Sequence, residues 1–488
     1  MFIATIVGLY TTRVVLQTLG VSDYGIFGVV GSITAMLSFL KISLSNSTTR
    51  FLSYEIGCGD AQRLSLTFST SMIIHIAMAV VIVVLAETIG LWFLENKLVI
   101  PEGRMDAARL VLHCSVISSA ITITQVPYNS SIIAHEKMNV YAYVEILYVV
   151  LKLVIVYLLV IGNFDKLKLY SALLLVVTII ISLIYFIYCR RQFKETSFSW
   201  VWNKTMMKDI TNFSLWQMFS SLCMTLKQQG QNFIVNIYRG VTLNASLGIS
   251  DMVYGTLTSL SYNMLAAFNP SIIKSYAAKD YQQMTSLVSN ASMLAFLLLA
   301  FVSVPFIINM EAILSLWLGE IPPYVCEICT IALIINCFGA FNSVLSTAVN
   351  ATGKNKSISI IIGFSMLFGL IVLCGTFICD LPIIYSFVAF YLGVPVMLLG
   401  CIIEVKRKIP FLPMRKIIGQ GILKPTIISC TVFMVVYYSQ MMFVEGFVRI
   451  LMTSLISSCL FAALVFTLCL TDQQRSLVRN KVKSIIIK

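Results

Sequence analysis

The chain has 488 residues, of which 58% are hydrophobic and only 11% are charged. An ordinary soluble domain carries about 25% charged residues, so this composition excludes a soluble globular enzyme, a disordered regulator and a nucleic-acid-binding domain. The mean hydropathy of +0.91 indicates a chain that uses a lipid bilayer as its solvent. The formal net charge of +13 must therefore be explained by membrane topology before any binding to nucleic acid is considered.

Long apolar runs, bounded by charged and turn residues, predict an all-α polytopic membrane protein with about 14 transmembrane helices of roughly 20 residues each. Helices are the expected form, because lipid offers the backbone no hydrogen-bond partner. In chain order the predicted spans cover residues 2–19, 22–44, 68–94, 107–133, 140–161, 167–188, 211–237, 244–268, 286–310, 325–349, 357–379, 382–404, 417–440 and 447–470. Pro305 and Pro395 fall inside the ninth and twelfth spans, where we expect bends.

Lys and Arg residues are distributed unequally between the two sides of the membrane. With the N-terminus in the cytoplasm, the cytoplasmic segments and span ends hold 23 of the 34 Lys and Arg residues, and the outer ones hold seven. Short cytoplasmic loops usually carry such an excess of positive charge. The sequence therefore predicts that both termini are cytoplasmic, and topology accounts for most of the net charge.

Three short self-matches indicate an internal duplication. Residues 20–29 match 240–249 and residues 60–65 match 280–285, both at an offset of 220, while residues 134–137 match 351–354 at an offset of 217. Because six spans separate the matched points, the two copies have parallel orientations. The predicted organisation is an N-terminal six-helix half, a cytoplasmic linker, a second six-helix half, and two additional helices with a basic tail. Their bounds are residues 1–188, 189–210, 211–405 and 406–488.

Several segments together resemble those of a known transporter family. They are residues 9–25 (LYTTRVVLQTLGVSDYG), 49–51 (TRF) with 59–60 (GD), 126–137 (VPYNSSIIAHEK), 269–270 (NP) and 273–276 (IKSY). This pattern resembles the polysaccharide and O-antigen flippases of the multidrug/oligosaccharidyl-lipid/polysaccharide exporter superfamily, and it extends over nearly the whole chain. The resemblance implies two parallel six-helix repeats that form a two-lobed bundle around a central cavity, followed by two extra C-terminal helices.

The resemblance also implies a function. It implies a flippase, a transporter rather than an enzyme, that moves undecaprenyl-diphosphate-linked oligosaccharide from the inner to the outer leaflet of the bacterial cytoplasmic membrane. The product would be O-antigen, capsular polysaccharide or exopolysaccharide. The implied partners are the lipid-linked oligosaccharide diphosphate and membrane lipid. A coupling ion, H+ or Na+, and a glycan polymerase partner are left open, and no cofactor, metal or nucleic acid is expected.

The fifth predicted span carries a polar stripe. Tyr141, Glu145, Tyr148 and Lys152 follow one another at spacings of four, three and four residues. Each residue turns an α-helix by about 100°, so these side chains share one face of an otherwise apolar helix. We predict that this face lines the transport cavity. The alternative is a Glu–Lys pair that holds two helices together.

Polar residues in three other spans extend this prediction. In the seventh span, Ser220, Lys227 and Gln231 share a face, and residues 227–232 contain no apolar side chain. We expect this face to line the cavity, with a kinked or re-entrant segment as the alternative. Arg13 in the first span and Lys41 in the second complete the set. Each either lines the cavity or extends its charged end to the membrane surface.

The sign of the charges inside the spans favours an anionic substrate. A charged side chain at the bilayer centre costs at least about 2.5 kcal/mol, so such residues should face protein or water. Four of those considered are basic, and Glu145 lies deepest among the acids. We predict that Arg13, Lys152 and Lys227 bind the diphosphate, and that Glu145 weakens their hold. In the alternative, each cation pairs with a local acid or extends to the surface.

Two other functions compete with the flippase. A cation-coupled multidrug exporter of the same superfamily should offer buried acids to cationic drugs, which the basic stripes disfavour. A membrane-embedded glycan polymerase or ligase needs a sizeable outer loop with acid and base groups. The longest predicted outer segments, residues 95–106 and 311–324, carry no such constellation.

Overall fold

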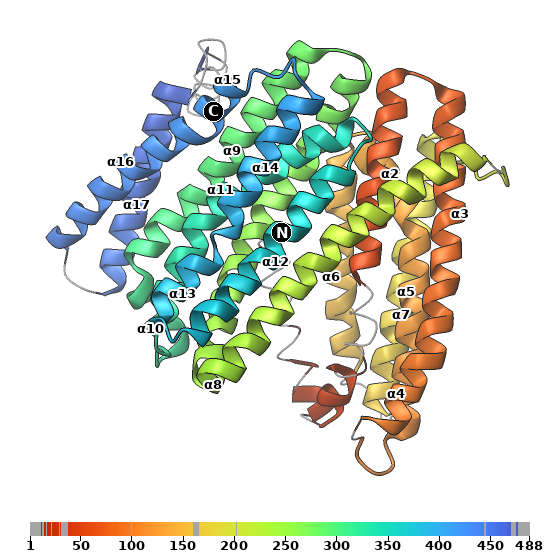
Figure 1. Cartoon of the computed structure of the whole chain (residues 1–488). Helices are drawn as coiled ribbons and strands as arrows, with labels where there is room; N and C mark the ends of the chain where they lie inside the picture. The colour runs from red at the N-terminus through yellow and green to blue at the C-terminus, as the bar shows by residue number, and fades with distance from the viewer. Residues whose placement is uncertain are drawn as a thin grey trace, which may run out of the picture. The chain divides into compact units, whose positions relative to one another are not determined.

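A computed structural model gives the arrangement of the chain (Figure 1). It describes residues 11, 14–15, 17–20, 22–28, 30, 38–98, 100–159, 165–201, 203–443, 446–469 and 475–476. The helices of the first half are α2 (Ser38–Cys58), α3 (Ala61–Leu85), η1 (Ala86–Gly90), α4 (Leu91–Asn96), α5 (Met105–Ala134), α6 (Met138–Leu158), α7 (Lys166–Gln192) and η2 (Lys194–Thr196). They are followed by α8 (Lys204–Ala277), α9 (Tyr281–Ile308), α10 (Met310–Leu318), α11 (Val325–Ala351), α12 (Lys356–Ile378), α13 (Ile383–Phe390) and α14 (Gly393–Lys408). The last elements are α15 (Met414–Ile418), η3 (Gly419–Leu423), α16 (Lys424–Ser439), η4 (Gln440–Met442), α17 (Phe447–Leu464) and η5 (Val465–Cys469).

The described residues form helices and the turns between them, which confirms the predicted fold class. Among these residues, ten helical segments are long and apolar enough to cross a membrane. Each corresponds to one predicted span, from the third through the sixth and from the ninth through the fourteenth. The predicted first and second spans lie partly outside the described residues, and α2 covers the end of the second.

The predicted seventh and eighth spans lie within α8, a helical segment of 74 residues that is interrupted at Gly240. Gly240 has φ 82° and ψ −175°, a conformation that residues with a Cβ atom rarely adopt. The interruption divides α8 into two arms, residues 204–239 and 241–277. The turn between the predicted spans is therefore made by one glycine.

The backbone has the same special conformation at matched points of the two sequence copies. Gly20 and Gly240 have φ of 80° and 82°, and Gly59 and Lys279 have φ of 74° and 59°. Glu136 and Gly353, matched at the offset of 217, have φ of 60° and 78°. The aspartates of the second match, at positions 60 and 280, both cap the helix that follows them. The duplication seen in three short sequence matches is thus also present in local backbone geometry.

The chain divides into two compact units. The N-terminal unit comprises Met1–Leu222, Ile273–Lys279 and Gly353–Ser359, and the C-terminal unit comprises Cys223–Ile272, Asp280–Thr352 and Ile360–Lys488. The predicted bounds of the two halves and of the linker stay predictions.

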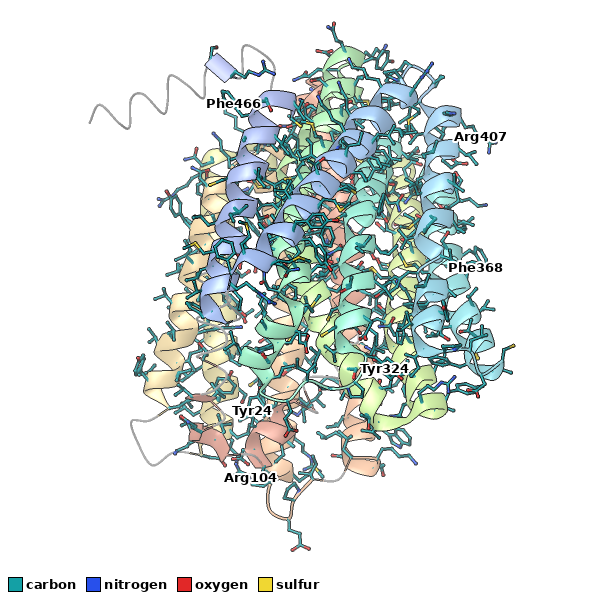
Figure 2. The ribbon with its side chains drawn as sticks, turned by 90° about the vertical axis from the view of Figure 1, so that its left-hand side faces the viewer. Tyr24, Arg104, Tyr324, Phe368, Arg407 and Phe466 are labelled. Carbon is teal, nitrogen blue, oxygen red and sulfur yellow. The ribbon has the colours of Figure 1, made fainter. Side chains whose placement is uncertain are left out.

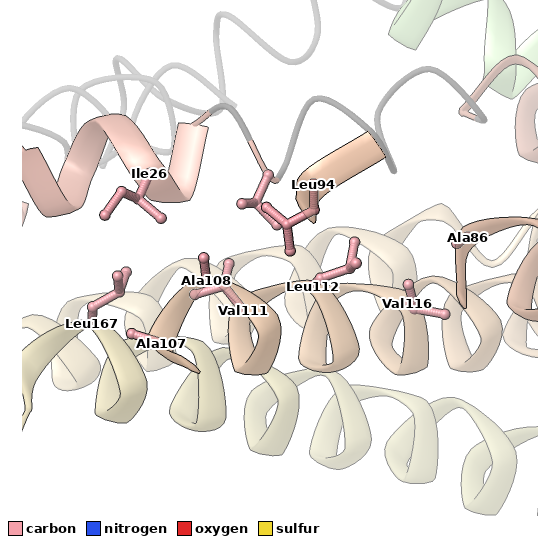
Figure 3. Packing of buried hydrophobic residues seen from close by; sticks show 10 residues of the cluster. Ile26, Ala86, Leu94, Ala107, Ala108, Val111, Leu112, Val116 and Leu167 are labelled. Carbon is pink, nitrogen blue, oxygen red and sulfur yellow. The ribbon is translucent and has the colours of Figure 1, made fainter. Parts of the chain in front are cut away.

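In the N-terminal unit, α5 packs against α2, α3 and α7. One buried apolar cluster joins residues from before α2, from η1 and α4, and from the starts of α5 and α7 (Figure 3). Ala107 and Ala108 lie at its centre and are almost fully buried. Small residues at such points let helices approach closely, which matters in a bilayer because lipid tails are as apolar as the side chains.

In the C-terminal unit, α9 packs against α11, α16 and α17, and α11 also packs against α14. Figure 2 shows Arg407 and Phe466 at one end of this unit and Tyr324 at the opposite end. Arg407 and Phe466 belong to the side that the Lys and Arg distribution predicts to be cytoplasmic, and Tyr324 to a predicted outer segment. In this unit, the residues predicted to be cytoplasmic thus lie at one end, and the residue predicted to be on the outer side lies at the other.

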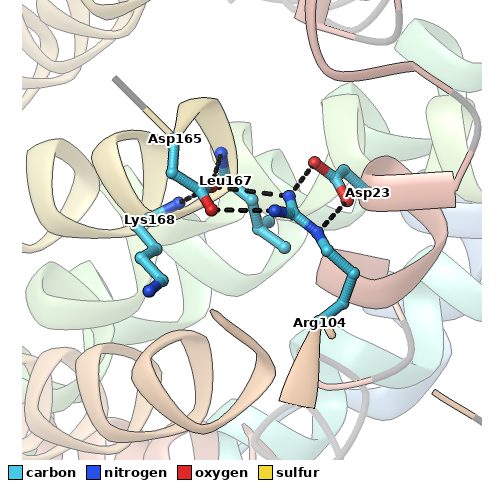
Figure 4. A network of polar contacts seen from close by, with 5 residues as sticks. All are labelled: Asp23, Arg104, Asp165, Leu167 and Lys168. Carbon is cyan, nitrogen blue, oxygen red and sulfur yellow. Dashed lines mark hydrogen bonds and ion pairs between the residues drawn. The ribbon is translucent and has the colours of Figure 1, made fainter. Parts of the chain in front are cut away.

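Arg104 links three segments of the N-terminal unit (Figure 4). Its Nε donates to Asp23 at 2.9 Å and its Nη1 donates to Asp165 at 2.8 Å. Asp165 also caps α7, because its carboxylate accepts the backbone N–H groups of Leu167 and Lys168. Partial burial raises the pKa of Asp165, but these backbone bonds and the Arg104 guanidinium outweigh burial and hold that pKa below its usual range.

Replacing Arg104 with Ala should lower the melting temperature of the purified protein, because Asp23 and Asp165 then lose their shared counter-charge. A partly buried, charge-assisted network of this kind contributes about 1–3 kcal/mol. In a large domain each kcal/mol shifts the melting temperature by roughly 2–4 °C. A thermal-shift assay in detergent measures the change.

The matched control is Arg109→Ala. Arg109 also pairs with an acid, Glu95, at 2.8 Å, but the two side chains are 46% and 37% exposed. An exposed pair contributes at most about 1 kcal/mol. Equal shifts in the two variants would contradict the structural role of Arg104. Because the folded-state pKa of Asp165 is lowered, its stabilisation is present above the unfolded pKa and lost as the pH falls through the folded value. The effect of Arg104→Ala should therefore shrink in acid.

Candidate functional site

The break at Gly240 brings polar residues of the two α8 arms together in the C-terminal unit. The Gln231 side-chain amide donates to both carboxylate oxygens of Asp251, at 2.8 and 3.1 Å. Gln231 is only 4% exposed. Gln231 lies nine residues before Gly240 and Asp251 eleven residues after it, so the two arms place them at similar heights.

Lys227 lies one turn before Gln231 and contacts two aromatic rings. Its Nζ is 4.9 Å from the ring centroid of Phe390 and 5.4 Å from that of Tyr391. A cation over a ring face at this distance gains about 0.5–2 kcal/mol, depending on how far it is desolvated. Lys227 also interacts electrostatically with Asp251. In the alternative to a diphosphate site, each cation pairs with a local acid, and for Lys227 that acid would be Asp251.

A break between α13 and α14 determines where these rings lie. α13 ends at Phe390 and α14 begins at Gly393, two residues before Pro395. Proline disfavours helical conformation in the residue before it and donates no N–H, which explains why the predicted twelfth span bends here. Neighbouring α12 approaches this break closely. A Cβ at Gly369 would lie 2.7 Å from the carbonyl oxygen of Phe390, and one at Gly393 would lie 2.5 Å from that of Ser365.

The N-terminal unit holds the second charged group, on α6 and α2. The Lys152 Nζ lies 4.4 Å from the ring centroid of Tyr148, one turn away on the same helix. Glu145 interacts electrostatically with both Lys152 and Lys41. Glu145 and Lys41 have exposed side chains, whereas Lys152 and Tyr148 are partly buried. The predicted stripe of the fifth span therefore exists as one helical face, and Lys41 lies within electrostatic reach of it.

The other predicted site residues have different outcomes. Arg13 lies outside the described residues, so the predicted diphosphate site of Arg13, Lys152 and Lys227 stays a prediction. Ser220 belongs to the N-terminal unit, where it is buried and its hydroxyl donates to the carbonyl of Gln217 at 3.0 Å.

Sequence reasoning missed three residues of the C-terminal group. Asp251 lies eleven residues after the turn glycine, and this distance is the signal that would have paired it with Gln231. Phe390 and Tyr391 gave no signal as single residues, since aromatic residues are common in spans. In the sequence, only Pro395 marked this segment as a place where the span bends. It gave no indication that the two rings contact Lys227.

Solved structures share this fold at low sequence identity. A MATE transporter in the straight conformation has a TM-score of 0.69 and 15% identity over 84% of this chain and 94% of that chain. A multidrug and polysaccharide superfamily transporter from Pyrococcus furiosus, described as having a binding pocket of reverse polarity, gives 0.65 and 14% over 85% and 94%. The Vibrio cholerae MATE transporter VcmN in the bent form gives 0.63 and 16% over 86% and 94%. At such identities these matches establish the fold alone.

The sequence itself matches a protein-family model. No curated protein matches the chain. The model described as polysaccharide biosynthesis protein matches residues 1–267, which is more than half of the chain. This confirms the family resemblance seen in the motifs at residues 9–25 and 126–137. The described residues hold helices suited to several membrane crossings, and the chain therefore belongs, as a multi-pass membrane protein, to the polysaccharide biosynthesis protein family.

Proposed function

We propose that this transporter is a flippase that moves undecaprenyl-diphosphate-linked oligosaccharide from the inner to the outer leaflet of the bacterial cytoplasmic membrane. The family match over residues 1–267 is the observation that carries the proposal. The glycan on the lipid would be a precursor of O-antigen, capsule or exopolysaccharide. The charged groups of the two units, each taken by itself, support an anionic headgroup.

In the N-terminal unit, two cations outnumber one acid. Lys41 and Lys152 both act on Glu145, and this group keeps an excess positive charge. The side chain of Glu145 is exposed on α6, a helix long and apolar enough to cross the membrane, and that of Lys41 is exposed near the cytoplasmic end of the second predicted span; contact of either charge with lipid would be costly. A water-filled transport path is the environment that allows such exposure. A diphosphate would bring the anion that Lys41 and Lys152 lack, with Arg13 as a further candidate ligand.

In the C-terminal unit, Lys227 is held by interactions that an incoming anion can replace. Ring contacts with Phe390 and Tyr391 leave the ammonium able to donate hydrogen bonds to another group. The carboxylate of Asp251 is meanwhile occupied by Gln231. A moderate hold on the cation suits a transporter, because a diphosphate bound too tightly would be released slowly.

A cation-coupled multidrug exporter is the second candidate. It is favoured by the fold shared with MATE transporters and by two of the acids that lie within spans, Glu145 and Asp251. In that case the two carboxylates would bind the cationic drug or the coupling ion, H+ or Na+. The two candidates predict opposite charges for the transported molecule, so transport assays can separate them.

Deleting the gene should leave lipid-linked glycan on the inner leaflet and remove its polymer from the cell surface, because no other route carries the headgroup through the bilayer. Surface glycan and accumulated lipid-linked precursor are measured in the deletion strain and in the strain complemented with the wild-type gene. Unchanged surface glycan in a strain without a second flippase would refute the proposal. Increased sensitivity to cationic drugs, without a glycan defect, would support the exporter instead.

Replacing Lys227 or Lys152 with Gln should reduce glycan export about tenfold or more, since one charge-assisted contact to a phosphate contributes roughly 1.5–3 kcal/mol. Lys227→Arg and Lys152→Arg should restore part of the export because they keep the charge. Export is measured in the deletion background at matched protein abundance.

The matched control is Lys208→Gln, which removes an exposed lysine of the same helix, α8, near its first turn. It should export like the wild type. Normal export from the Lys152→Gln/Lys227→Gln double variant at wild-type abundance would eliminate these lysines as ligands.

We further propose that both termini are cytoplasmic, on the basis of the Lys and Arg distribution. Two native cysteines with exposed side chains test this: Cys58 on the predicted cytoplasmic side and Cys379 on the predicted outer side. In single-cysteine variants, a membrane-impermeant thiol reagent added to intact cells should label Cys379 and spare Cys58. A cysteine placed at position 203 should also be spared. The reverse labelling pattern would invert the topology.

A further inference from the structure

A polar cavity lies at the predicted cytoplasmic end of the C-terminal unit, apart from the site described above. Its volume is about 620 Å³. It is enclosed by the first three turns of α9, by the segment from residue 411 through η3 to the start of α16, and by Cys469 at the end of η5. Tyr281 and Phe411 both line it, and their rings stack at 3.9 Å. Nothing in the proposed transport function accounts for this cavity.

Two polar helical faces line the cavity. On α9, the lining residues recur at helical spacing from Gln282 through Ser286 and Asn290 to Met293. On the opposite segment, Lys416, Gln420 and Lys424 follow at intervals of four residues, so they also share a face. Twelve residues separate Tyr281 from Met293, which corresponds to a depth of roughly 18 Å along the helix. If α9 crosses the bilayer as predicted, the cavity extends from the cytoplasmic surface into the level of one leaflet.

The charge of the cavity is positive and unbalanced. Lys416 and Lys424 are its charged lining residues, and no lining residue is acidic. Within the described parts of the chain, neither lysine forms an ion pair. Lys408 on nearby α14 differs, since its Nζ pairs with Glu404 at 3.2 Å. Two cations without an acid favour an anion between them.

Ser289 supplies an independent indication of a ligand. It lines the cavity wall, yet it is only 4% exposed, and its hydroxyl has no hydrogen-bond partner among the described residues. An unpartnered buried polar group costs about 1–3 kcal/mol, so such groups usually have a partner. A ligand with several oxygen atoms would supply that partner.

We propose that this cavity binds the headgroup of an anionic glycerophospholipid from the cytoplasmic leaflet. Lys416 and Lys424 would contact the phosphodiester as point charges, and the polar face of α9, with Ser289, would contact the hydroxyl groups of the headgroup. The apolar outer surfaces of the same helices would remain in contact with the acyl chains. The C-terminal tail is a poor occupant, because Arg479, Lys481, Lys483 and Lys488 give it the same charge as the cavity.

Lipid binding to the purified, delipidated full-length protein tests this proposal. Phosphatidylglycerol and the zwitterionic phosphatidylethanolamine are titrated, and bound lipid is measured by native mass spectrometry. The wild type should prefer phosphatidylglycerol. Lys416→Gln/Lys424→Gln should weaken phosphatidylglycerol binding by about fivefold for each lysine removed and leave phosphatidylethanolamine binding unchanged.

The matched control is Lys406→Gln/Arg415→Gln, which removes the same charge from exposed positions at the same helix ends but outside the cavity lining. The control should keep the wild-type preference. An equal loss in the control would mean that general surface charge attracts the lipid, and unchanged binding in the lysine variant would also overturn the proposal. Ser289→Ala, a small change suited to the buried position, should weaken phosphatidylglycerol binding even if the double variant fails to fold.

Competition with inorganic phosphate distinguishes the source of the anion. Millimolar phosphate should not displace phosphatidylglycerol if the glycerol headgroup and chains contribute to binding. Displacement at that concentration would assign the cavity to free phosphate instead and overturn the lipid proposal. None of these measurements requires transport, so their outcome is independent of the proposed flippase function.

Discussion

The hydrocarbon core of a bilayer offers no hydrogen-bond partner, and the architecture of this protein follows from that constraint. In the described parts of the chain, ten apolar segments long enough to cross the bilayer are helices, because a helix satisfies its own backbone. Near two interruptions of the helical pattern, polar side chains from other elements donate hydrogen bonds to backbone carbonyls. The buried Asn342 amide donates to the carbonyl of Val394 beside the α13–α14 break, and Arg239 donates to the carbonyl of Leu381 before α13.

The same constraint acts on charged side chains within the spans. Lys227 and Lys152 both have their ammonium groups over aromatic rings, at 4.4–5.4 Å from the centroids. An aromatic ring is apolar enough to occupy a membrane helix and still stabilises a cation. Each unit also keeps one acid near its cation, Glu145 or Asp251. The rings and the acid together stabilise each lysine only in part. The ammonium group can therefore remain charged within the membrane without being held in a single ion pair.

The sequence predicted the helices well because apolar runs and charged boundaries are direct consequences of the bilayer. The stripe from Tyr141 to Lys152 was also accessible, since spacing alone defines a helical face. Contacts between distant segments could not be predicted from the sequence. The rings of Phe390 and Tyr391 reach Lys227 only because α12 approaches the α13–α14 break, which depends on Gly369 and Gly393. In the sequence, Lys416 and Lys424 only add to the positive charge of the predicted cytoplasmic side, and their cavity becomes visible once α9 is packed opposite them.

The matched left-handed residues of the two halves have a consequence for how such duplications are recognised. Gly59 in one copy corresponds to Lys279 in the other, whereas Glu136 corresponds to Gly353. A left-handed conformation costs a residue with a side chain roughly 1–2 kcal/mol relative to glycine. Each half therefore has glycine at one of these two corners and a residue with a side chain at the other, so the two halves share the backbone geometry where they differ in residue type. At these matched positions, the backbone dihedral angles therefore identify the repeat where the amino-acid types no longer do.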